Sequence, residues 1–364
     1  LVLFTGDYIY ENESKPHLRV RPHRTPSPND LAGYRLRYAS YKLDPALQAL
    51  HAAHPWLLTW DDHEVENDYT GTHSAWGRGD ADFLRLRIGA FKAYYEHMPL
   101  SPRLSRPDGP SMRIYDRFDF GTLARVSMLD GRQYRSRAAC YGPPKKGRAH
   151  FETPATCPEL MDEQRSMIGA EQEGWLYLGF AQSPARWNIL GQDVMMARLR
   201  STEGDLRDAY WTDSWDGFPS SRARVLQRIS DTKLSNPVVL SGDIHSYWAN
   251  DLKLDFDKPN APVVATEFVG TSVTSDNLDD ILQVAPSTVS LTVEAAIRTA
   301  NPHVRYLDFD RHGYSVLTLT PARAQMDWYA LADRTNRQST ARWSAGFETL
   351  PGTNRVRRVW KAAS

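Results

Sequence analysis

The stretch VVLSGDIHS (residues 238–246) runs from a short apolar strand directly into a turn that carries an aspartate and a histidine. The same pattern of an apolar run followed by polar residues occurs at the strands predicted over 1–5, 56–60, 122–129 and 187–191. Open α/β sheets place their ligands at the carboxyl ends of the strands. Five such strand ends in one chain predict a functional site at one edge of a sheet.

Strands and helices alternate along the rest of the chain, which indicates an α/β layered fold. Asp44 and Pro45 form a helix start, and apolar residues recur every three to four positions before Pro99. The other predicted elements are a strand at 263–269, a hairpin of strands 314–319 and 323–330, helices at 44–54, 81–97 and 163–180, and a long loop at 15–30.

Composition excludes several classes of protein. The chain has 364 residues, with 41% hydrophobic and 24% charged residues, which is ordinary globular usage. Its 44 basic and 44 acidic residues cancel, so the net charge gives no electrostatic footprint for nucleic acid or an anionic membrane. No apolar run approaches the roughly 18 residues of a membrane-spanning helix.

The two cysteines, Cys140 and Cys157, enclose a segment rich in proline, glycine and lysine and match no zinc-ligand spacing. A disulfide that closes this loop is the preferred interpretation, and two free buried thiols are the alternative. A disulfide would indicate an oxidising compartment, so we expect an extracytoplasmic protein, periplasmic or secreted.

The polar residues at the strand ends are of the kinds that bind hard cations. Glycine at position 6 permits a tight turn that directs Asp7 inward. The motif WDDHE at 60–64 places several like charges next to one another, and these need a compensating cation. Oxygen ligands with one nitrogen and no sulfur favour Ca²⁺, Mg²⁺, Mn²⁺ or ferric iron over a structural zinc. The candidate ligands are Asp7, Tyr10, Asp62, Asp243 and His245.

Other catalytic motifs are missing from the sequence. It contains no GxSxG, GxxxxGK[ST], GxGxxG or HExxH pattern. Ser272 in VGTSVTS could be a nucleophile, but the sequence places no base beside it.

Seven segments together resemble PhoD-like alkaline phosphatases and phosphodiesterases, in the same order along the chain. The resemblance also extends to the wider calcineurin-like and purple-acid-phosphatase-like metallophosphoesterases. The sequence departs from that wider pattern, with DHE for NHE and GDIH for GHxH, as is usual in the PhoD branch. The segments are GDYIYE (6–11), TWDDHEVEND (59–68), LDGRQYR (129–135), IGAEQEGWL (168–176), LSGDIHS (240–246), TEFVGTS (266–272) and HGYSVLTLT (312–320).

The resemblance implies a four-layer αββα sandwich of two mixed sheets flanked by helices, with Ca²⁺ and Fe³⁺ at the strand ends. It implies that Asp7 bridges the metals and that Tyr10 gives a phenolate to iron. Asp62 stands where the wider pattern has its metal-binding asparagine, and Asp243 and His245 stand where it has two histidines.

Two further residues take metal-binding roles by the same resemblance. Gln192 occupies the position of another metal-binding histidine. Asn67 is a further calcium ligand or a residue that supports one.

The implied activity is hydrolysis of phosphate monoesters or diesters, small molecules included, by a metal-activated hydroxide. We expect His63 to contact phosphate or donate a proton, or alternatively to support a ligand. Arg132 could offer a bidentate fork to phosphate, or alternatively pair with Asp130 or another carboxylate of the site.

The alternatives are a phospholipase D-like phosphodiesterase and a catalytically silent binding module. In the second case, the segment YWTDSWDGF (210–218) would stack on sugars or bases, although it would more readily form a rim of the active site.

The resemblance also bears on the start of the chain. We expect residues 1–364 to form a single catalytic domain that is truncated at its amino terminus. An upstream strand with a cysteine iron ligand, a small β-domain and an export signal would lie outside these residues. LVLFT (1–5) is predicted to be a strand buried on both faces.

Overall fold

The computed structural model describes the whole chain except residues 102, 105–108, 143–146, 202–203, 205–207 and 364. Part of the loop between the two cysteines therefore lies outside the described residues. No helix in the described residues combines the length and the apolar character that crossing a membrane requires.

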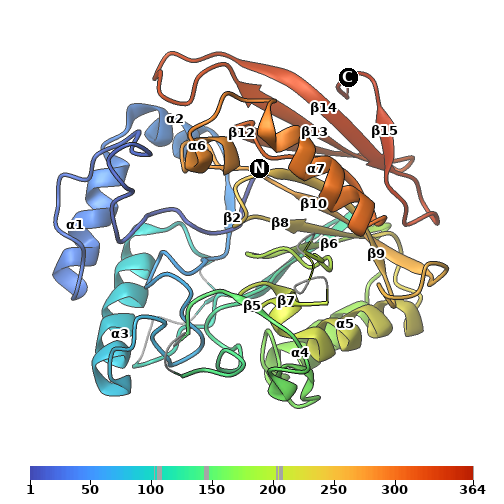
Figure 1. Ribbon diagram of the computed structural model, residues 1–364, viewed down its shortest axis with the longest axis horizontal. Helices are drawn as coiled ribbons and strands as arrows, with labels where there is room; N and C mark the ends of the chain where they lie inside the picture. The colour runs from blue at the N-terminus through green and yellow to red at the C-terminus, as the bar shows by residue number, and fades with distance from the viewer. Residues whose placement is uncertain (102, 105–108, 143–146, 202–203, 205–207, 364) are drawn as a thin grey trace.

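A seven-stranded mixed sheet forms the centre of the molecule (Figure 1). Its four inner strands β10, β8, β6 and β4 are parallel, whereas β9, β11 and β3 run antiparallel to their neighbours. In spatial order the strands are β11 (Val304–Asp308), β9 (Tyr247–Lys253), β10 (Val263–Val269), β8 (Pro237–Ser241), β6 (Trp187–Gly191), β4 (Ala124–Met128) and β3 (Asp116–Phe120).

A second, antiparallel sheet packs on the first. The core between the two sheets contains Val126 and Val238 from the central sheet and Met326, Trp328 and Phe347 from the second. The hairpin predicted at 314–319 and 323–330 is confirmed as its first two strands. The strands of this sheet are β12 (Gly313–Leu319), β13 (Ala324–Leu331), β14 (Ala341–Thr349) and β15 (Arg357–Val359).

Helices pack on the outside of the central sheet, which confirms the α/β class. Helices α4 (Ala170–Ala181) and α5 (Pro219–Asp231) bury Leu176, Val225 and Ile229 against the central sheet. The other helices are α1 (Leu31–Lys42), α2 (Pro45–Ala53), α3 (Asp80–His97), α6 (Leu278–Leu282), α7 (Val289–Ala300) and 3₁₀ turns at Pro158–Met161 and Trp215–Gly217.

A two-stranded parallel sheet links the helices α1 and α3 to the rest of the fold. Its strands are β1 (Val2–Phe4) and β2 (Trp56–Leu58). The prediction that β1 is buried on both faces needs correction, because its residues are only half-buried. Val2 and Phe4 pack toward the helices, while Leu3 packs toward the core between the sheets.

Two helix predictions had different outcomes. The Asp44 side chain accepts hydrogen bonds from the N–H groups of Ala46 and Leu47, as expected of a helix start. The helix predicted over 163–180 begins only at Ala170, because Gly169 adopts a left-handed φ of 75° that interrupts the preceding turn. The Gly169 N–H donates to Ser166 Oγ at 2.8 Å.

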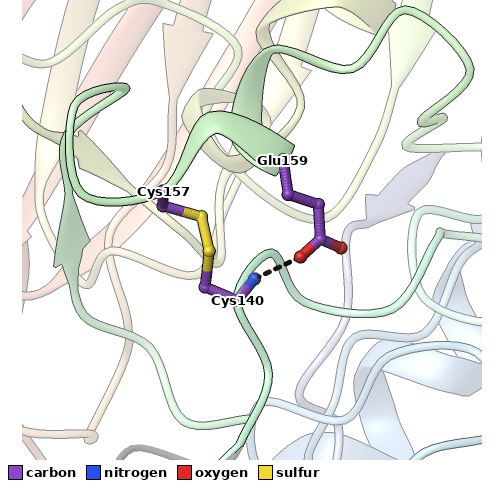
Figure 2. A group of neighbouring side chains, drawn as sticks. All are labelled: Cys140, Cys157 and Glu159. Atoms are coloured by element: carbon purple, nitrogen blue, oxygen red, sulfur yellow. Dashed lines mark hydrogen bonds between the residues drawn. A yellow bond between two sulfur atoms is a disulfide. The ribbon is translucent and has the colours of Figure 1, made fainter.

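The disulfide predicted between Cys140 and Cys157 is present, so the alternative of two free thiols is wrong (Figure 2). The Cys140 N–H donates to Glu159 Oε2 at 2.8 Å, next to the bridge. The closed loop includes β5 (Phe151–Glu152), which pairs with β7 (Tyr210–Trp211). The disulfide thus secures a segment that borders Asp213, three residues after the start of β7.

Candidate active site

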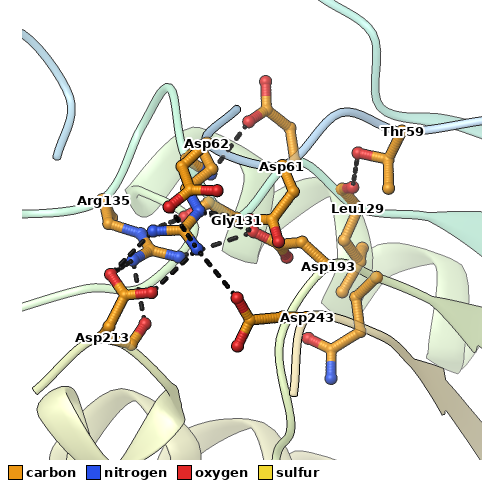
Figure 3. Close-up of polar contacts among 12 residues, drawn as sticks. Thr59, Asp61, Asp62, Leu129, Gly131, Arg135, Asp193, Asp213 and Asp243 are labelled. Carbon is orange, nitrogen blue, oxygen red and sulfur yellow. Dashed lines mark hydrogen bonds and ion pairs between the residues drawn. The ribbon is translucent and has the colours of Figure 1, made fainter. Parts of the chain in front are cut away.

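Two arginines and a group of aspartates meet where the strands of the central sheet end. The Arg132 side chain is fully buried, and its Nε donates to Asp61 Oδ1 at 2.5 Å. Its Nη1 and Nη2 donate to the two oxygens of Asp213 at 2.7 and 2.8 Å. In Figure 3, the carboxylates of Asp61, Asp62, Asp193, Asp213 and Asp243 lie close together with the side chain of Arg135. Arg132 is therefore held by carboxylates.

Three more carboxylates lie within ion-pair distance of the same guanidinium. The closest N···O distances from Arg132 are 3.5 Å to Asp62, 3.6 Å to Asp193 and 3.8 Å to Asp243. These aspartates follow β2, β6 and β8, and Arg132 follows β4. Strand ends that are far apart in the sequence thus meet at one place, as the sequence pattern predicted.

Close approach at these turns requires glycine at two positions. A Cβ on Gly6 would lie 2.4 Å from the Cβ of Asp61, and one on Gly131 would lie 2.3 Å from Asp193 Oδ1. Since real Cβ atoms do not approach other atoms this closely, any side chain here would push the aspartates out of the site.

Negative charge exceeds positive charge in this cluster. Besides Arg132, the second buried cation is Arg135, which contacts Asp213 at 3.1 Å and Asp193 at 3.4 Å. The two arginines face five aspartates, namely Asp61, Asp62, Asp193, Asp213 and Asp243, and Asp7 lies beside Asp62. Buried carboxylates in excess are costly unless a cation compensates them.

Four of these aspartates each have a buried oxygen without a hydrogen-bond partner among the described residues: Asp7 Oδ1, Asp61 Oδ2, Asp62 Oδ1 and Asp193 Oδ1. Asp62 belongs to three groups whose ligand atoms lie within 4.8 Å of one another: with Asp7 and His63, with Asp61 and Asp243, and with Asp68 and Asp213. Such oxygen-rich groups suit hard cations such as Ca²⁺ and Mg²⁺. The residues present therefore fit a metal centre built around Asp62.

The crowding changes the acidity of the aspartates. Burial raises the pKa of Asp7 well above its usual value, and the nearby Asp62, Glu64 and Asp243 raise it further. Burial and the charge of Asp61 likewise raise the pKa of Asp243. For Asp62, burial is outweighed by Arg132 and His63, which hold its pKa at about 2. Asp62 thus stays ionised, while a bound cation would stabilise the charged forms of the neighbouring aspartates.

Tyr10 and His245 lie side by side at the Asp7 end of the site. The Tyr10 hydroxyl donates to Asp7 Oδ2 at 3.1 Å and lies 2.9 Å from His245 Nε2. Asp7, Asp243 and His245 all have a positive φ, of 58°, 69° and 49°. Left-handed backbone at non-glycine residues is strained and concentrates at functional sites.

His63 has a carboxylate partner that was not among the predicted site residues. Its Nδ1 lies 2.6 Å from Oε2 of the buried Glu11, and its ring packs on Tyr10 at 4.2 Å between centroids. Burial lowers the pKa of His63, but Glu11, Asp62 and Asp7 outweigh it and raise the pKa well above the usual value. His63 is therefore held as a cation, with Nε2 left for another partner.

We expect the substitution Glu11→Gln to lower the pKa of His63 by about 1–3 units, the usual effect of an opposite charge at this distance. Because the raised pKa keeps His63 protonated at alkaline pH, the variant should lose turnover at a lower pH than the wild type if His63 is the proton donor. NMR titration of the histidine rings and a pH profile of kcat measure both effects. Glu13→Gln, at an exposed position, is the control, and an unmoved alkaline limb in Glu11→Gln would contradict the role of His63.

For two of the expected metal ligands, the structure gives contacts with residues outside the aspartate cluster. Gln192 is buried, with Nε2 donating to Ser241 Oγ at 3.1 Å and Oε1 accepting from the Trp215 indole. Because an amide oxygen has two lone pairs, this contact leaves the assignment of Gln192 as a metal ligand a prediction. For Asn67 the structure gives a contact of the backbone, whose N–H donates to Glu11 Oε1 at 2.9 Å.

Several functional residues were not predicted. Asp61 and Asp193 follow the strands predicted over 56–60 and 187–191, so their positions carried a signal. Asp213 lies within YWTDSWDGF, a segment whose tryptophans suggest stacking on a ligand and not a metal site. Trp215 in that segment is fully buried in the core, so it is not available to stack on a sugar or base.

Comparison with known proteins points to one family. The family model of PhoD-like phosphatases matches residues 1–328. Alkaline phosphatase D of Bacillus subtilis (strain 168) is 38% identical over 338 residues, which cover 90% of this chain and 54% of that protein. A solved structure titled "Structure of PhoD" superposes with a TM-score of 0.85 at 35% identity, over 99% of this chain and 66% of that one. The chain thus spans about half the length of the curated relative that it matches.

Proposed function

The chain belongs to the PhoD-like phosphatase family, and we propose that it hydrolyses phosphate esters at the carboxylate cluster in a metal-dependent reaction. The observation that carries this proposal is the set of buried oxygens without partners on Asp7, Asp61 and Asp62, three aspartates that belong to the groups around Asp62. An enzyme that acts on phosphoric ester bonds needs a nucleophile, neutralisation of the phosphoryl charge and protonation of the leaving oxygen.

The residues divide into two neighbouring sets of proposed ligands. Asp7, Tyr10 and His245 would hold Fe³⁺, since a phenolate suits a hard ferric ion. Asp61, Asp62 and Asp243 would hold Ca²⁺, which prefers carboxylate oxygens. When bound, the cations would supply a water of lowered pKa and neutralise the phosphoryl oxygens.

The remaining residues act on protons and on position. His63 carries a proton that Nε2 can give to the leaving oxygen, because Nδ1 is occupied by Glu11. Arg132 holds Asp61 and Asp213 in fixed orientations through its three hydrogen bonds. We assign Arg132 this supporting role in place of a direct phosphate contact.

Tyr10→Phe tests the iron assignment. A phenolate bound to ferric iron should absorb visible light, so we expect a coloured wild-type protein whose visible band is lost in the variant. Tyr41→Phe is the control, since the Tyr41 hydroxyl accepts from the Tyr10 N–H but is not a proposed ligand. A colourless wild-type protein with full turnover and no iron by elemental analysis would contradict the assignment.

The type of ester is tested by turnover on p-nitrophenyl phosphate and bis-p-nitrophenyl phosphate with added Ca²⁺. Hydrolysis of the first indicates a monoesterase and hydrolysis of the second a diesterase, including one of the phospholipase D-like kind. Hydrolysis of neither substrate by the metal-loaded protein would contradict the proposed function.

The disulfide supports an extracytoplasmic location. Structural disulfides persist in oxidising compartments such as the periplasm or the cell exterior. The Cys140–Cys157 bridge closes a loop whose Ala149 N–H donates to Asp68 at 3.0 Å, so it supports the site directly.

A further inference from the structure

A chain of hydrogen bonds joins Ser272, His312 and Asp280 outside the carboxylate cluster. Ser272 Oγ lies 3.2 Å from His312 Nδ1, and His312 Nε2 lies 3.0 Å from Asp280 Oδ2. The three residues come from the loop after β10, the turn before β12 and helix α6. The structure thus supplies the base beside Ser272 that the sequence did not place.

This arrangement resembles a serine nucleophile with its base, but the hydroxyl proton is used elsewhere. Ser272 Oγ donates to the carbonyl oxygen of Ser275 at 2.6 Å, which is closer than its contact with the imidazole. The Ser272 carbonyl in turn accepts from the Gly313 N–H at 3.0 Å. Ser272 therefore fixes the shape of residues 271–276, which we call the 271–276 loop.

The 271–276 loop touches two of the proposed iron ligands. The Asp276 carbonyl oxygen accepts from His245 Nδ1 at 2.7 Å. The Ser275 side chain lies near enough to the Tyr10 hydroxyl to lower its pKa, against the larger effect of burial, which raises it. The position of this loop thus influences the orientation of the His245 ring and of the Tyr10 hydroxyl.

Arg334, in the turn between β13 and β14, ties this loop to its surroundings. Its Nη2 lies 2.9 Å from Asp280 Oδ1, and its Nη1 donates to the Thr274 carbonyl at 2.6 Å. A longer contact of 3.4 Å reaches the Leu18 carbonyl in the long loop near the amino terminus. One guanidinium, only 10% exposed, therefore connects helix α6, the 271–276 loop and the 15–30 segment.

We propose that Arg334 is a positioning residue that acts through Asp280 and the 271–276 loop to set the tautomer and orientation of the His245 ring. Arg334 lies beyond residues 1–328, the segment that the family model matches. The inference rests on the proposed function only in taking His245 as a metal ligand.

The physical reason lies in the two nitrogens of a neutral imidazole, of which one carries a proton and the other a lone pair. The Asp276 carbonyl accepts a hydrogen bond from Nδ1–H, which keeps the proton on Nδ1 and leaves the lone pair on Nε2, the nitrogen that faces Tyr10 and the site. Partners that orient a ligand in this way typically contribute about 10–100-fold to metal affinity or activity. If the loop moves, the other tautomer becomes available and the ligand atom is lost.

The test compares Arg334→Ala with Arg337→Ala, which removes the same charge from an exposed position in the same turn. Long-range ¹H–¹⁵N NMR of the metal-free protein, with His245→Gln to assign the signal, reports the His245 tautomer. We expect Arg334→Ala to lose the pure Nδ1–H form, with kcat and iron affinity reduced about 10–100-fold and KM nearly unchanged. Arg337→Ala should match the wild type in all four measurements.

A double-mutant cycle separates this mechanism from general loosening of the fold. Arg334→Ala and Asp280→Asn act through one contact, so the double variant should show little more loss of kcat than either single variant. Arg334→Lys should restore part of the loss, because an ammonium can pair with Asp280 without reaching both carbonyls.

An unchanged His245 tautomer together with unchanged kcat in Arg334→Ala would overturn the proposal, as would fully additive losses in the cycle. If the wild type hydrolyses neither phosphate ester, the proposed function fails, and the tautomer comparison in the metal-free protein still decides the positioning role.

Discussion

Replacing Arg132 with methionine should lower the free energy of unfolding of the metal-free protein by about 3–5 kcal/mol. The substitution leaves Asp61 buried without its cation and leaves Asp213 with Arg135 alone, and uncompensated buried charges are strongly destabilising. Urea unfolding of the metal-free protein, followed by circular dichroism, measures the change.

The matched control for this prediction is Arg125→Met. Arg125 pairs with Asp119, whose side chain is half exposed, so its loss should cost no more than about 1 kcal/mol. Added Ca²⁺ should restore part of the stability of Arg132→Met, since a cation can take over the compensation of the carboxylates. A loss no greater than that of Arg125→Met would contradict the role of Arg132 as the structural counter-ion of the site.

The second large effect is expected for Asp7→Asn, which should change activity and stability in opposite directions. Turnover should fall by more than about 100-fold, because a direct metal ligand contributes more than the residues that orient one. The thermal midpoint of the metal-free protein should rise, since the variant removes a buried carboxyl that Asp62 and Asp243 disfavour.

Thermal unfolding with and without metal, together with kcat, tests both halves of this prediction. Asp231→Asn, at an exposed position at the end of α5, should leave turnover and thermal midpoint unchanged. Full turnover in Asp7→Asn would exclude Asp7 from the metal site. A metal-free variant less stable than the wild type would show that Asp7 is held by favourable contacts rather than by a missing cation.

Much of the site could be predicted because it depends on strand ends. Strands β4, β6 and β8 are parallel neighbours, so the residues that follow them must lie at one edge of the sheet. Asp193 and Asp243 illustrate this, and Asp7 joins them because β1 and β2 end side by side. A pattern of apolar run and acidic turn is sufficient to predict this convergence.

Other residues depend on contacts that no local pattern reveals. Asp213 reaches Arg132 from 81 positions away, in a segment whose strand is only two residues long. The side chain of Gln192 meets Trp215, a contact that arises only once the core has packed. Helix α1 was not predicted, because its buried face includes Tyr34, Arg37 and Tyr38 and so shows no clear apolar stripe.

The most direct test of the central claim is the rate at which the protein hydrolyses bis-p-nitrophenyl phosphate and p-nitrophenyl phosphate. The rate is measured before chelation, after chelation and after metals are restored, and the metal content is determined on the same samples. If the cluster around Asp62 is a catalytic metal centre, turnover should disappear with the metals and return when Ca²⁺ and Fe³⁺ are restored, and Asp62→Asn should remain inactive throughout. Full turnover in a sample without detectable metal, or in metal-loaded Asp62→Asn, would contradict the claim.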